Sequence, residues 1–489
     1  MKLLNQLIDG APSIEIEYLS QDSRDILNNT IFFCIKGARF DGHVYCKDAI
    51  SRGAVCIVHS DDLEEKVEGV VYIQVEDVVS TMNHVCAAFY DDVTTKMHVI
   101  GVTGTNGKST TSYVCHQLLN HLGEKCGYIG TICIEYNGVK YPSPYTTPEC
   151  AFTHKTIATM YDKEIRALSM EVSSQGLEWR RVDSVDFDVA IYTNLTHDHL
   201  DVHGTMENYL QAKLRLFKIL KSDALAVINL DDEYYEVIKE ACECHTVSYS
   251  IYKDEADYVA KDITMNASCT EFTLVHQGVE YPVKTNLLAL FNVSNLVAAI
   301  AAVHGLGHPL EEIVKYVSDF EQVGGRVDVI DEGQPFNVVV DYAHSPDSLN
   351  RIFEFARSSL SPNGQIIAVF GSAGHRDAMK RTTMGECADR FCDLIVLTAE
   401  DPRSESPKEI ANQIKAGITK NRVVFIENRE MAIQQAIEMA NPGDTVLILG
   451  KGREDYLDMA SGKEYYPGDH IVARNALKSL LCDEFDSDY

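Results

Sequence analysis

The chain has 489 residues, of which 45% are hydrophobic and 24% charged, and its formal net charge at pH 7 is −30. This length predicts about three domains. The acidic balance argues against a nucleic-acid or anionic-membrane surface, because both need an excess of Lys and Arg, but it leaves room for small anionic ligands.

The pattern of cysteines indicates the cellular compartment in which the protein works. Fourteen Cys are scattered along the chain without a Cys-x-x-Cys pair, and several lie in apolar runs where a free thiol behaves as a small hydrophobe. No apolar stretch reaches the roughly 20 residues that span a bilayer, and residues 1–10 do not resemble a signal peptide. We therefore expect a cytoplasmic protein without membrane insertion, and we take it to be a monomer.

Residues 1–96 contain short apolar runs separated by polar turns, which predict the strands of a small mixed domain. These runs are Ile31–Ile35, Ala54–Val58 and Val71–Val75. The stretch Asp91–Lys96 has the composition of a linker.

Residues 97–331 alternate strand and helix patterns. A buried strand at Met97–Val102 leads through a glycine-rich loop into a helix at Ser109–Leu122. Further predicted strands are Ala167–Val172, Val189–Tyr192 and Ala224–Ile228. This alternation predicts an α/β domain with a mostly parallel sheet and helices on both faces.

Residues 332–489 follow a second predicted linker, Gly324–Pro335. Five apolar runs then recur with helical segments between most of them: VVVDYAH, IIAVFGSA, LIVLTAE, VVFIE and TVLILG. They predict a Rossmann-like doubly wound sheet, in which ligands bind at the carboxyl ends of the strands.

The strongest motif is GVTGTNGKSTT, Gly101–Thr111, between a predicted strand and a predicted helix. Amides of such a turn and of the helix start bind phosphate oxygens. A lysine adds charge, and a hydroxyl can bind Mg²⁺. Val102 stands where the usual Walker pattern has Gly, and the alternative is an ordinary glycine-rich turn. The expected ATP contacts are Gly104, Thr105, Asn106, Gly107, Lys108, Ser109 and Thr110.

The variant TGTNGKST resembles the Mur ligase family, which builds bacterial cell-wall precursors, and further matches follow in the family's order over nearly the whole chain. The resemblance is greatest to members that add the third amino acid of the stem peptide. It implies a uridine-nucleotide domain (1–96), a central ATPase (97–331) and a C-terminal Rossmann-like domain (332–489). It also implies ATP and Mg²⁺ as cofactors, and an ADP-forming ligase that joins a diamino acid to UDP-N-acetylmuramoyl-L-alanyl-D-glutamate through an acyl phosphate.

The nucleotide-linked peptide would bind to the first two domains by this resemblance. The segments Asp22–Arg24 and Gly37–His43 look like those that hold the uridine diphosphate, and two central segments match those that hold the muramoyl peptide. Trp179, the only Trp, stands where the family often has Gln. The implied contacts are Ser23, Arg24, His43, Thr146, Thr147, Ser173, Trp179 and Arg181.

The catalytic centre is expected around Lys108, Glu171, His199 and Lys213. Glu171 closes an apolar strand, where a carboxylate can hold Mg²⁺ together with Ser109. His199 lies in THDHLDVH and matches a metal ligand of the family, although its clustered His and Asp also suggest zinc. Lys213 matches a lysine that is carbamylated in the family, which would make it a further metal ligand. Its position alone indicates a routine helix-surface lysine.

Residues near the domain joint match family contacts to ATP. Asn292 and Asn295 match an adenine-side motif, although Asn near a helix start can also be a cap. Ala289, just before them, stands where the family usually has Gly. The further implied ATP contacts are Arg326, Asp341 and His344.

The amino-acid pocket is implied in the third domain by Arg376, Glu400, Asp401, Arg403, Gly450 and Glu454. Arg403 and Arg376 could clamp both carboxylates of meso-diaminopimelate, because a guanidinium forms paired hydrogen bonds. Asp401 replaces a neutral Asn, and its added charge would suit the lone ammonium of L-lysine. We expect meso-diaminopimelate first and L-lysine next. Arg453 stands where the family normally has His.

Two other functions stay open. One is a folylpolyglutamate-type ligase that shares the ATPase core, against which the uridine-type first domain and the Asp-Pro-Arg segment argue. The other is a non-catalytic ATP-binding regulator, which the departures at Ala289, Trp179 and Arg453 would allow.

Overall fold

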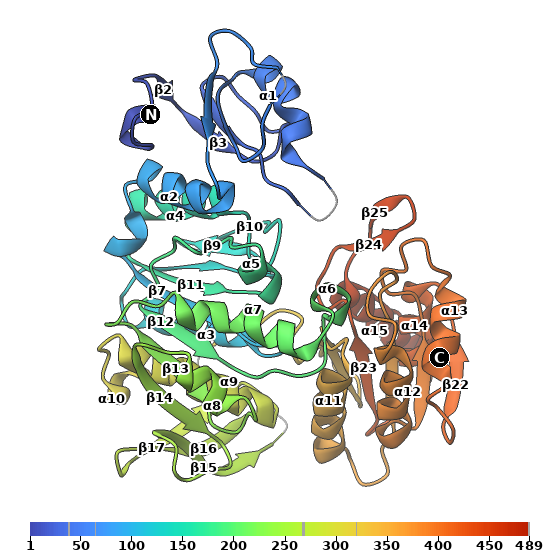
Figure 1. Ribbon diagram of the computed structural model, residues 1–489. Helices are drawn as coiled ribbons and strands as arrows, with labels where there is room; N and C mark the ends of the chain where they lie inside the picture. Colours follow the sequence, from blue (N-terminus) through green and yellow to red (C-terminus); the bar gives the residue numbers. More distant parts are fainter. Residues whose placement is uncertain (38–39, 64, 267–268, 319, 488–489) are drawn as a thin grey trace.

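Three large sheets follow one another along the chain in the computed structural model, which describes residues 1–487 apart from 38–39, 64, 267–268 and 319 (Figure 1). This agrees with the predicted α/β class. The division at residues 96/97 and 331/332 stays a prediction. Within the described part of the chain, no helix is long and apolar enough to cross a bilayer.

The first sheet has four parallel strands in the order β3-β4-β5-β6, beside a small antiparallel pair, β1-β2. Apolar side chains of α2 cover one face of the sheet, and those of α1 cover the other. The elements are β1 (Lys2–Leu3), η1 (Leu4–Gln6), β2 (Glu15–Ile16), β3 (Tyr18–Ser20), β4 (Thr30–Phe33), η2 (Gly42–Tyr45), α1 (Cys46–Arg52), β5 (Ala54–His59), β6 (Val71–Gln74) and α2 (Val78–Phe89).

The predicted linker Asp91–Lys96 is instead an ordered turn of 3-10 helix, η3 (Val93–Lys96). Val93 and Thr94 are buried, and Val93 packs into the core of the central sheet. The stretch was predicted to be a linker because all its residues except Val93 are polar, and Val93 alone packs into the core.

The central sheet has eleven strands in the order β10-β9-β8-β11-β7-β12-β13-β14-β15-β16-β17. It is parallel from β8 to β15, as predicted, and antiparallel at both ends. The strands are β7 (His98–Thr103), β8 (Cys126–Ile129), β9 (Ile134–Tyr136), β10 (Val139–Tyr141), β11 (Ala167–Glu171), β12 (Val189–Tyr192), β13 (Leu225–Asn229), β14 (His245–Ser250), β15 (Tyr258–Met265), β16 (Thr270–His276) and β17 (Val279–Thr285).

Helices cover both faces of this sheet. Residues of α3 and α9 lie in one core cluster, and those of α4, α5, α7 and α8 lie in the other. The helices are α3 (Lys108–His121), α4 (Cys150–Asp162), α5 (Ser174–Glu178), α6 (Leu200–His203), α7 (Met206–Lys218), α8 (Tyr235–Glu240), α9 (Leu290–Gly305) and α10 (Leu310–Ile313).

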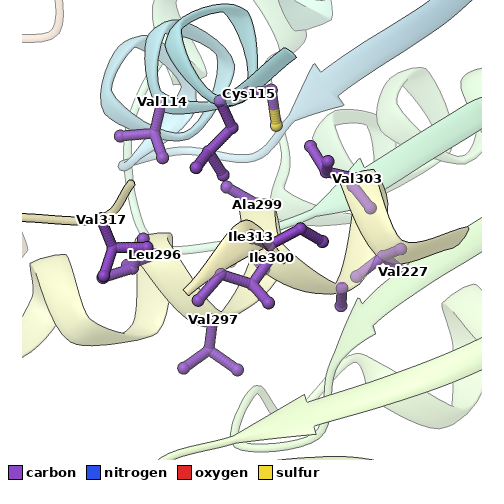
Figure 2. Close-up of a cluster of buried hydrophobic side chains, with 14 of the residues drawn as sticks. Val114, Cys115, Val227, Leu296, Val297, Ala299, Ile300, Val303, Ile313 and Val317 are labelled. Atoms are coloured by element: carbon purple, nitrogen blue, oxygen red, sulfur yellow. The ribbon is translucent and has the colours of Figure 1, made fainter. Parts of the chain in front are cut away.

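Helix α9 holds α3 in place, and α3 carries the phosphate-loop motif at its start. Figure 2 shows Val114 and Cys115 of α3 close to Ala299 of α9, and Val303 of α9 next to Val227 of β13. An apolar helix of this kind is buried on nearly all sides. The close packing fixes the direction in which the first turn of α3 points.

The third sheet has the order β18-β19-β23-β20-β21-β22 and is parallel except for β18. The five predicted runs correspond to β19, β20, β21, β22 and β23, so this prediction is confirmed. The predicted linker Gly324–Pro335 contains β18, because its apolar residues pair with β19. The elements are β18 (Asp328–Val329), β19 (Asn337–Asp341), α11 (Pro346–Ser359), β20 (Ile366–Phe370), α12 (Lys380–Phe391), β21 (Leu394–Leu397), α13 (Pro407–Lys415), β22 (Arg422–Phe425), α14 (Arg429–Glu438), β23 (Thr445–Leu449), β24 (Tyr456–Met459), β25 (Gly462–Tyr465) and α15 (Asp469–Ser487).

Candidate functional site

The glycine-rich loop joins β7 to α3, as the motif predicts. Gly107 has φ +89°, and a Cβ atom there would lie 2.4 Å from Oδ1 of Asn295. Both the backbone conformation and the close approach therefore require Gly. The backbone N–H of Asn106 donates to Oδ1 of Asn194 at 2.9 Å, which ties the loop to the segment after β12.

Lys108, the first residue of α3, turns its ammonium back over this loop. Its Nζ donates to the carbonyls of Gly104 and Thr105 at 2.9 and 2.8 Å. Burial lowers the pKa of Lys108. The ammonium thus lies over the loop beside the first turn of α3, where amide groups without helical partners favour an anion.

Glu171 ends β11, next to β7, and is buried. Its carboxylate accepts hydrogen bonds from Ser109 Oγ at 2.9 Å, Tyr128 OH at 2.8 Å and the N–H of Thr131 at 2.7 Å. The Ser109 hydroxyl also accepts from Arg326 Nη2 at 3.1 Å. A hydroxyl beside a carboxylate supplies the hard oxygen ligands that Mg²⁺ prefers, so these residues fit the predicted metal.

His199 lies next to Asp198, a buried carboxylate missed by the site prediction although it belongs to the same His-Asp-His cluster. Asp198 lies 3.6 Å from His344 Nε2 and 3.6 Å from Lys380 Nζ. Burial disfavours its charge, but His344, His199 and Lys380 outweigh that and hold its pKa well below its usual value.

Burial lowers the pKa of His199 to about 3, although its side chain keeps 36% exposure. The direction of this shift favours the neutral imidazole that ligates metals. Within the described residues, the one group of three His, Cys, Asp or Glu ligands within reach of a single ion is Asp41, His43 and Asp61. The zinc alternative at His199 gains no support from it.

Lys213 on α7 is almost fully buried, with 1% exposure. Its Nζ lies 4.5 Å from the ring centroid of Tyr209. Burial and the charge of Lys108 lower the pKa of Lys213 far below its usual value. The interpretation of Lys213 as a helix-surface lysine is therefore wrong, because the side chain lies on the inner face of α7.

Asn292 and Asn295, at the start of α9, support the loop. Asn295 Nδ2 donates to Asn292 Oδ1 at 3.0 Å, and Asn292 Nδ2 donates to the Leu288 carbonyl at 2.7 Å. The left-handed φ of +76° at Ala289 explains why Gly suits this position.

The remaining predicted ATP contacts lie around the loop and the joint to the third sheet. The guanidinium of Arg326 stacks on Tyr342 at 4.7 Å. Asp341 uses its two carboxylate oxygens to accept backbone N–H groups, one of them from Val327 at 2.7 Å, and burial raises its pKa. Thr110 is buried on α3.

The predicted peptide contacts of the central part come together beside Glu171. Thr147 Oγ1 donates to the Glu171 carbonyl and accepts from the N–H of Ser173, both at 2.9 Å. Arg181 Nη1 donates to the Thr147 carbonyl at 2.7 Å. Thr146 lies 2.9 Å from Thr131 through their hydroxyl oxygens.

The predicted uridine contacts form a separate group in the first part of the chain. Arg24 is exposed and pairs with Asp22 at 2.6 Å, and Ser23 is buried. His43 Nδ1 lies 2.6 Å from Asp41, and its Nε2 accepts the Ser60 N–H at 3.1 Å. Ala38 and Arg39 of the predicted Gly37–His43 segment lie outside the described residues.

The predicted amino-acid residues gather around a cation that the site prediction missed. Lys451, with 1% side-chain exposure, lies 2.9 Å from Asp401 and 2.5 Å from Glu454. Glu400 is buried against Gly450, and burial raises its pKa.

Two arginines of the third part have partners there. Arg403 Nε lies 2.9 Å from Asp458. Arg453 lies 2.6 Å from Asp328 and so contacts the segment that enters the third sheet. At position 453, where the resemblance implies His, this chain has an arginine that pairs with the carboxylate of Asp328.

Charged contacts join the third part to the central segment around His199. Arg376 Nη1 lies 3.4 Å from Asp201, and Asp377 lies 3.0 Å from His197 Nε2. Together with the contacts of His344 and Lys380 to Asp198, they bring the predicted amino-acid loops beside the phosphate loop. Figure 1 shows α6 of the central part close to the third part.

Three family models match the chain. They are the Mur ligase family catalytic domain over residues 15–90, the Mur ligase middle domain over 102–303 and the Mur ligase glutamate ligase domain over 325–452.

Individual proteins match along almost the whole chain. A UDP-N-acetylmuramoyl-L-alanyl-D-glutamate–2,6-diaminopimelate ligase of Geobacillus kaustophilus is 39% identical, with 95% of each chain covered. A UDP-N-acetylmuramyl-tripeptide synthetase of Borrelia garinii is 37% identical, with 98% of this chain and 96% of that one covered. A solved structure of a 2,6-diaminopimelate ligase of the same description is 30% identical, with a TM-score of 0.70 and coverage of 98% and 99%.

Gly107 and Gly123 give a matched test of the loop at the two ends of α3. Both have positive φ, +89° and +86°, but a Cβ at Gly123 has no atom within 4 Å. Gly107→Ala should weaken binding of a non-hydrolysable ATP analogue by at least about tenfold, because the loop must move away from Asn295. Gly123→Ala should keep the affinity of the unchanged protein. Calorimetric titration measures both, and equal affinities would show that the loop does not bind the nucleotide.

Proposed function

The chain belongs to the Mur ligase family, and from this we propose that it is an ADP-forming ligase of peptidoglycan precursor synthesis. It joins a diamino acid to UDP-N-acetylmuramoyl-L-alanyl-D-glutamate through an acyl phosphate. The observation that carries the proposal is the grouping of Lys108, Ser109 and Glu171 at one loop, with amino-acid loops of the third part beside them. A cytoplasmic location and a monomeric state stay predictions.

The chemistry needs charge stabilisation and positioning. A carboxylate is a poor electrophile, and transfer of the γ-phosphoryl group of ATP gives it a good leaving group. The amides at the start of α3 and the Lys108 ammonium bind the phosphates and offset the negative charge that spreads over the transferring group. The α-amine of the amino acid then attacks the carbonyl and phosphate leaves, without a covalent bond to the protein.

Mg²⁺ would be held by Ser109, Glu171 and His199, where it supplies charge neutralisation for the phosphates. Arg326 reaches the Ser109 hydroxyl from the joint to the third sheet. It therefore orients the hydroxyl and brings a further cation to the same place.

The environment of Lys213 favours its conversion to a carbamate that could bind Mg²⁺. Addition of CO₂ needs a neutral amine, and burial favours that form of Lys213. The amine nitrogen forms a bond to the CO₂ carbon and releases a proton to solvent, which turns a buried neutral amine into an anion. A carbamate on Lys213, whose charge acts on His199, would supply a further oxygen ligand for Mg²⁺.

The contacts of Asp401 favour meso-diaminopimelate over L-lysine. The argument for lysine was that Asp401 offers a carboxylate to a lone ammonium, but Lys451 already neutralises that carboxylate. Arg403 pairs with Asp458 through Nε, and its Nη2 group is the part of the guanidinium that would bind a distal carboxylate. The relative from Geobacillus kaustophilus is named for 2,6-diaminopimelate.

The findings argue against both alternatives, a folylpolyglutamate-type ligase and a non-catalytic ATP-binding regulator. The match of residues 15–90 to a Mur ligase model supports a muramoyl substrate over a folate. Arg453 forms an ion pair with Asp328, and Ala289 adopts the positive φ that its position requires. These two departures from the family pattern therefore give no reason to regard the site as inactive.

A ligation assay tests the function. Given ATP, Mg²⁺, UDP-N-acetylmuramoyl-L-alanyl-D-glutamate and a panel of amines, the protein should release ADP and form a longer peptide most rapidly with meso-diaminopimelate. Lys108→Ala should lower the rate by at least about 100-fold, because the phosphoryl group loses a desolvated cation. Absence of both ADP and product with every amine would refute the proposal.

The carbamate can be detected directly. With ¹³C-bicarbonate at about pH 8, a carbamate resonance should be present in the unchanged protein and should disappear on acidification, because protonation of the amine releases CO₂. Lys213→Ala should abolish the signal. Lys218→Ala, at an exposed position on the same helix, is the control and should retain it. A signal that survives in Lys213→Ala would assign the modification elsewhere.

Arg403 should decide selectivity for a distal carboxylate. Arg403→Lys keeps the charge but loses paired hydrogen bonding, so kcat/KM for meso-diaminopimelate should fall by about 10- to 100-fold, which corresponds to roughly 1.5–3 kcal/mol. The value for L-lysine should change much less. Arg422→Lys, at an exposed position on β22, is the matched control. Equal losses for both amino acids would contradict this role.

A further inference from the structure

The guanidinium of Arg181 contacts two aromatic rings. Its central carbon lies 4.8 Å from the centroid of Tyr145 and 4.8 Å from the centroid of Trp179. Tyr145 comes from the loop between β10 and α4, and Trp179 follows α5 directly. Both rings are about half exposed, at 54% and 48%, whereas Arg181 is only 8% exposed.

Hydrogen bonds fix the edge of the same guanidinium. Nη1 donates to the Thr147 carbonyl at 2.7 Å, and Nη2 donates to Glu149 at 2.9 Å. Thr147 in turn bonds to the Glu171 carbonyl through its hydroxyl. Thr147 thus connects Arg181 to the end of β11, where the predicted metal ligand Glu171 lies.

The aromatic contacts have two physical effects on Arg181. Cation–π attraction and ring packing limit the motion of a long side chain, so the plane of the guanidinium is held in one orientation. The rings also exclude water from around the cation, which strengthens its attraction for an anion. A guanidinium has five N–H groups, and the two bonds above leave three that make no hydrogen bond to the described part of the chain. A planar carboxylate fits such an edge.

We propose that Trp179 and Tyr145 are positioning residues that hold Arg181 for a carboxylate of the muramoyl peptide. This rests on the proposed function and extends it, because it gives the substitution of Trp for the family's usual Gln a definite role. Trp179 acts through Arg181 on affinity for the nucleotide-linked peptide and leaves phosphoryl transfer to the residues around Glu171.

Steady-state kinetics separate this role from a general structural one. Trp179→Ala should raise the KM for UDP-N-acetylmuramoyl-L-alanyl-D-glutamate about tenfold, with kcat and the KM values for ATP and the amino acid within about twofold of the unchanged protein. Trp179→Phe keeps an aromatic ring and should restore most of the affinity, whereas Trp179→Gln should behave like Trp179→Ala. Tyr252→Ala, at an exposed site with 71% exposure, is the control and should change none of these values.

The single Trp provides a second test that needs no catalysis. Addition of the nucleotide-linked peptide without ATP should change the fluorescence of Trp179, and Arg181→Met should abolish that change. A Trp179→Ala variant with unchanged KM for the peptide, or with equal losses for all three substrates, would overturn the proposal, as would fluorescence that does not respond to saturating peptide. If the unchanged protein binds the peptide with a fluorescence change but forms no product, the ligase proposal fails and the positioning role stands.

Discussion

The buried carboxylate of Glu171 is the constraint around which the centre of the molecule is arranged. A buried anion is costly unless hydrogen bonds or cations satisfy it. Here the hydroxyls of Ser109 and Tyr128 and the N–H of Thr131 do so. Gly130 must lack a side chain, because a Cβ would lie 2.4 Å from Glu171 Oε1. One side chain thus fixes the start of α3 relative to the ends of β8 and β11, and the packing of α9 on α3 keeps that geometry rigid.

Charged contacts join the third sheet to this centre, beside an apolar contact that Leu288 and Ala289 make with its core. Arg326 reaches Ser109 from the connection between the sheets, and Lys380 and His344 reach Asp198. Polar contacts of this kind form and break more easily than an apolar interface, and domains joined by them commonly move. The proposed function requires substrates bound to separate parts of the chain to meet at one carboxylate, which would need the third part to close onto the central part.

Local patterns predicted the parts of this arrangement that depend on neighbouring residues. The order of strand, loop and helix around Gly107 and the five strands of the third sheet follow from glycine content and apolar runs. Pairings between distant charges have no such local pattern. Lys451 meets Asp401 only because β23 and β21 both belong to one sheet, and Arg453 meets Asp328 through the joint. The burial of Lys213 depended on which face of α7 meets the sheet, and family resemblance alone had singled that residue out.

The chain carries a net charge of −30, yet Lys108, Lys213, Arg326 and Lys380 gather around the site. Burial lowers the pKa values of Lys108 and Lys213, so both ammonium groups are costly to keep charged, although nearby carboxylates, Asp198 among them, offset part of this cost. On the proposed function, nucleotide phosphates would bring a further anion to Lys108, and a carbamate would replace the amine of Lys213. Binding of ATP would then be linked to the protonation of Lys108. The cations that would meet the phosphates, Lys108 and Arg326, lie at the loop between β7 and α3, within a chain whose net charge is strongly negative.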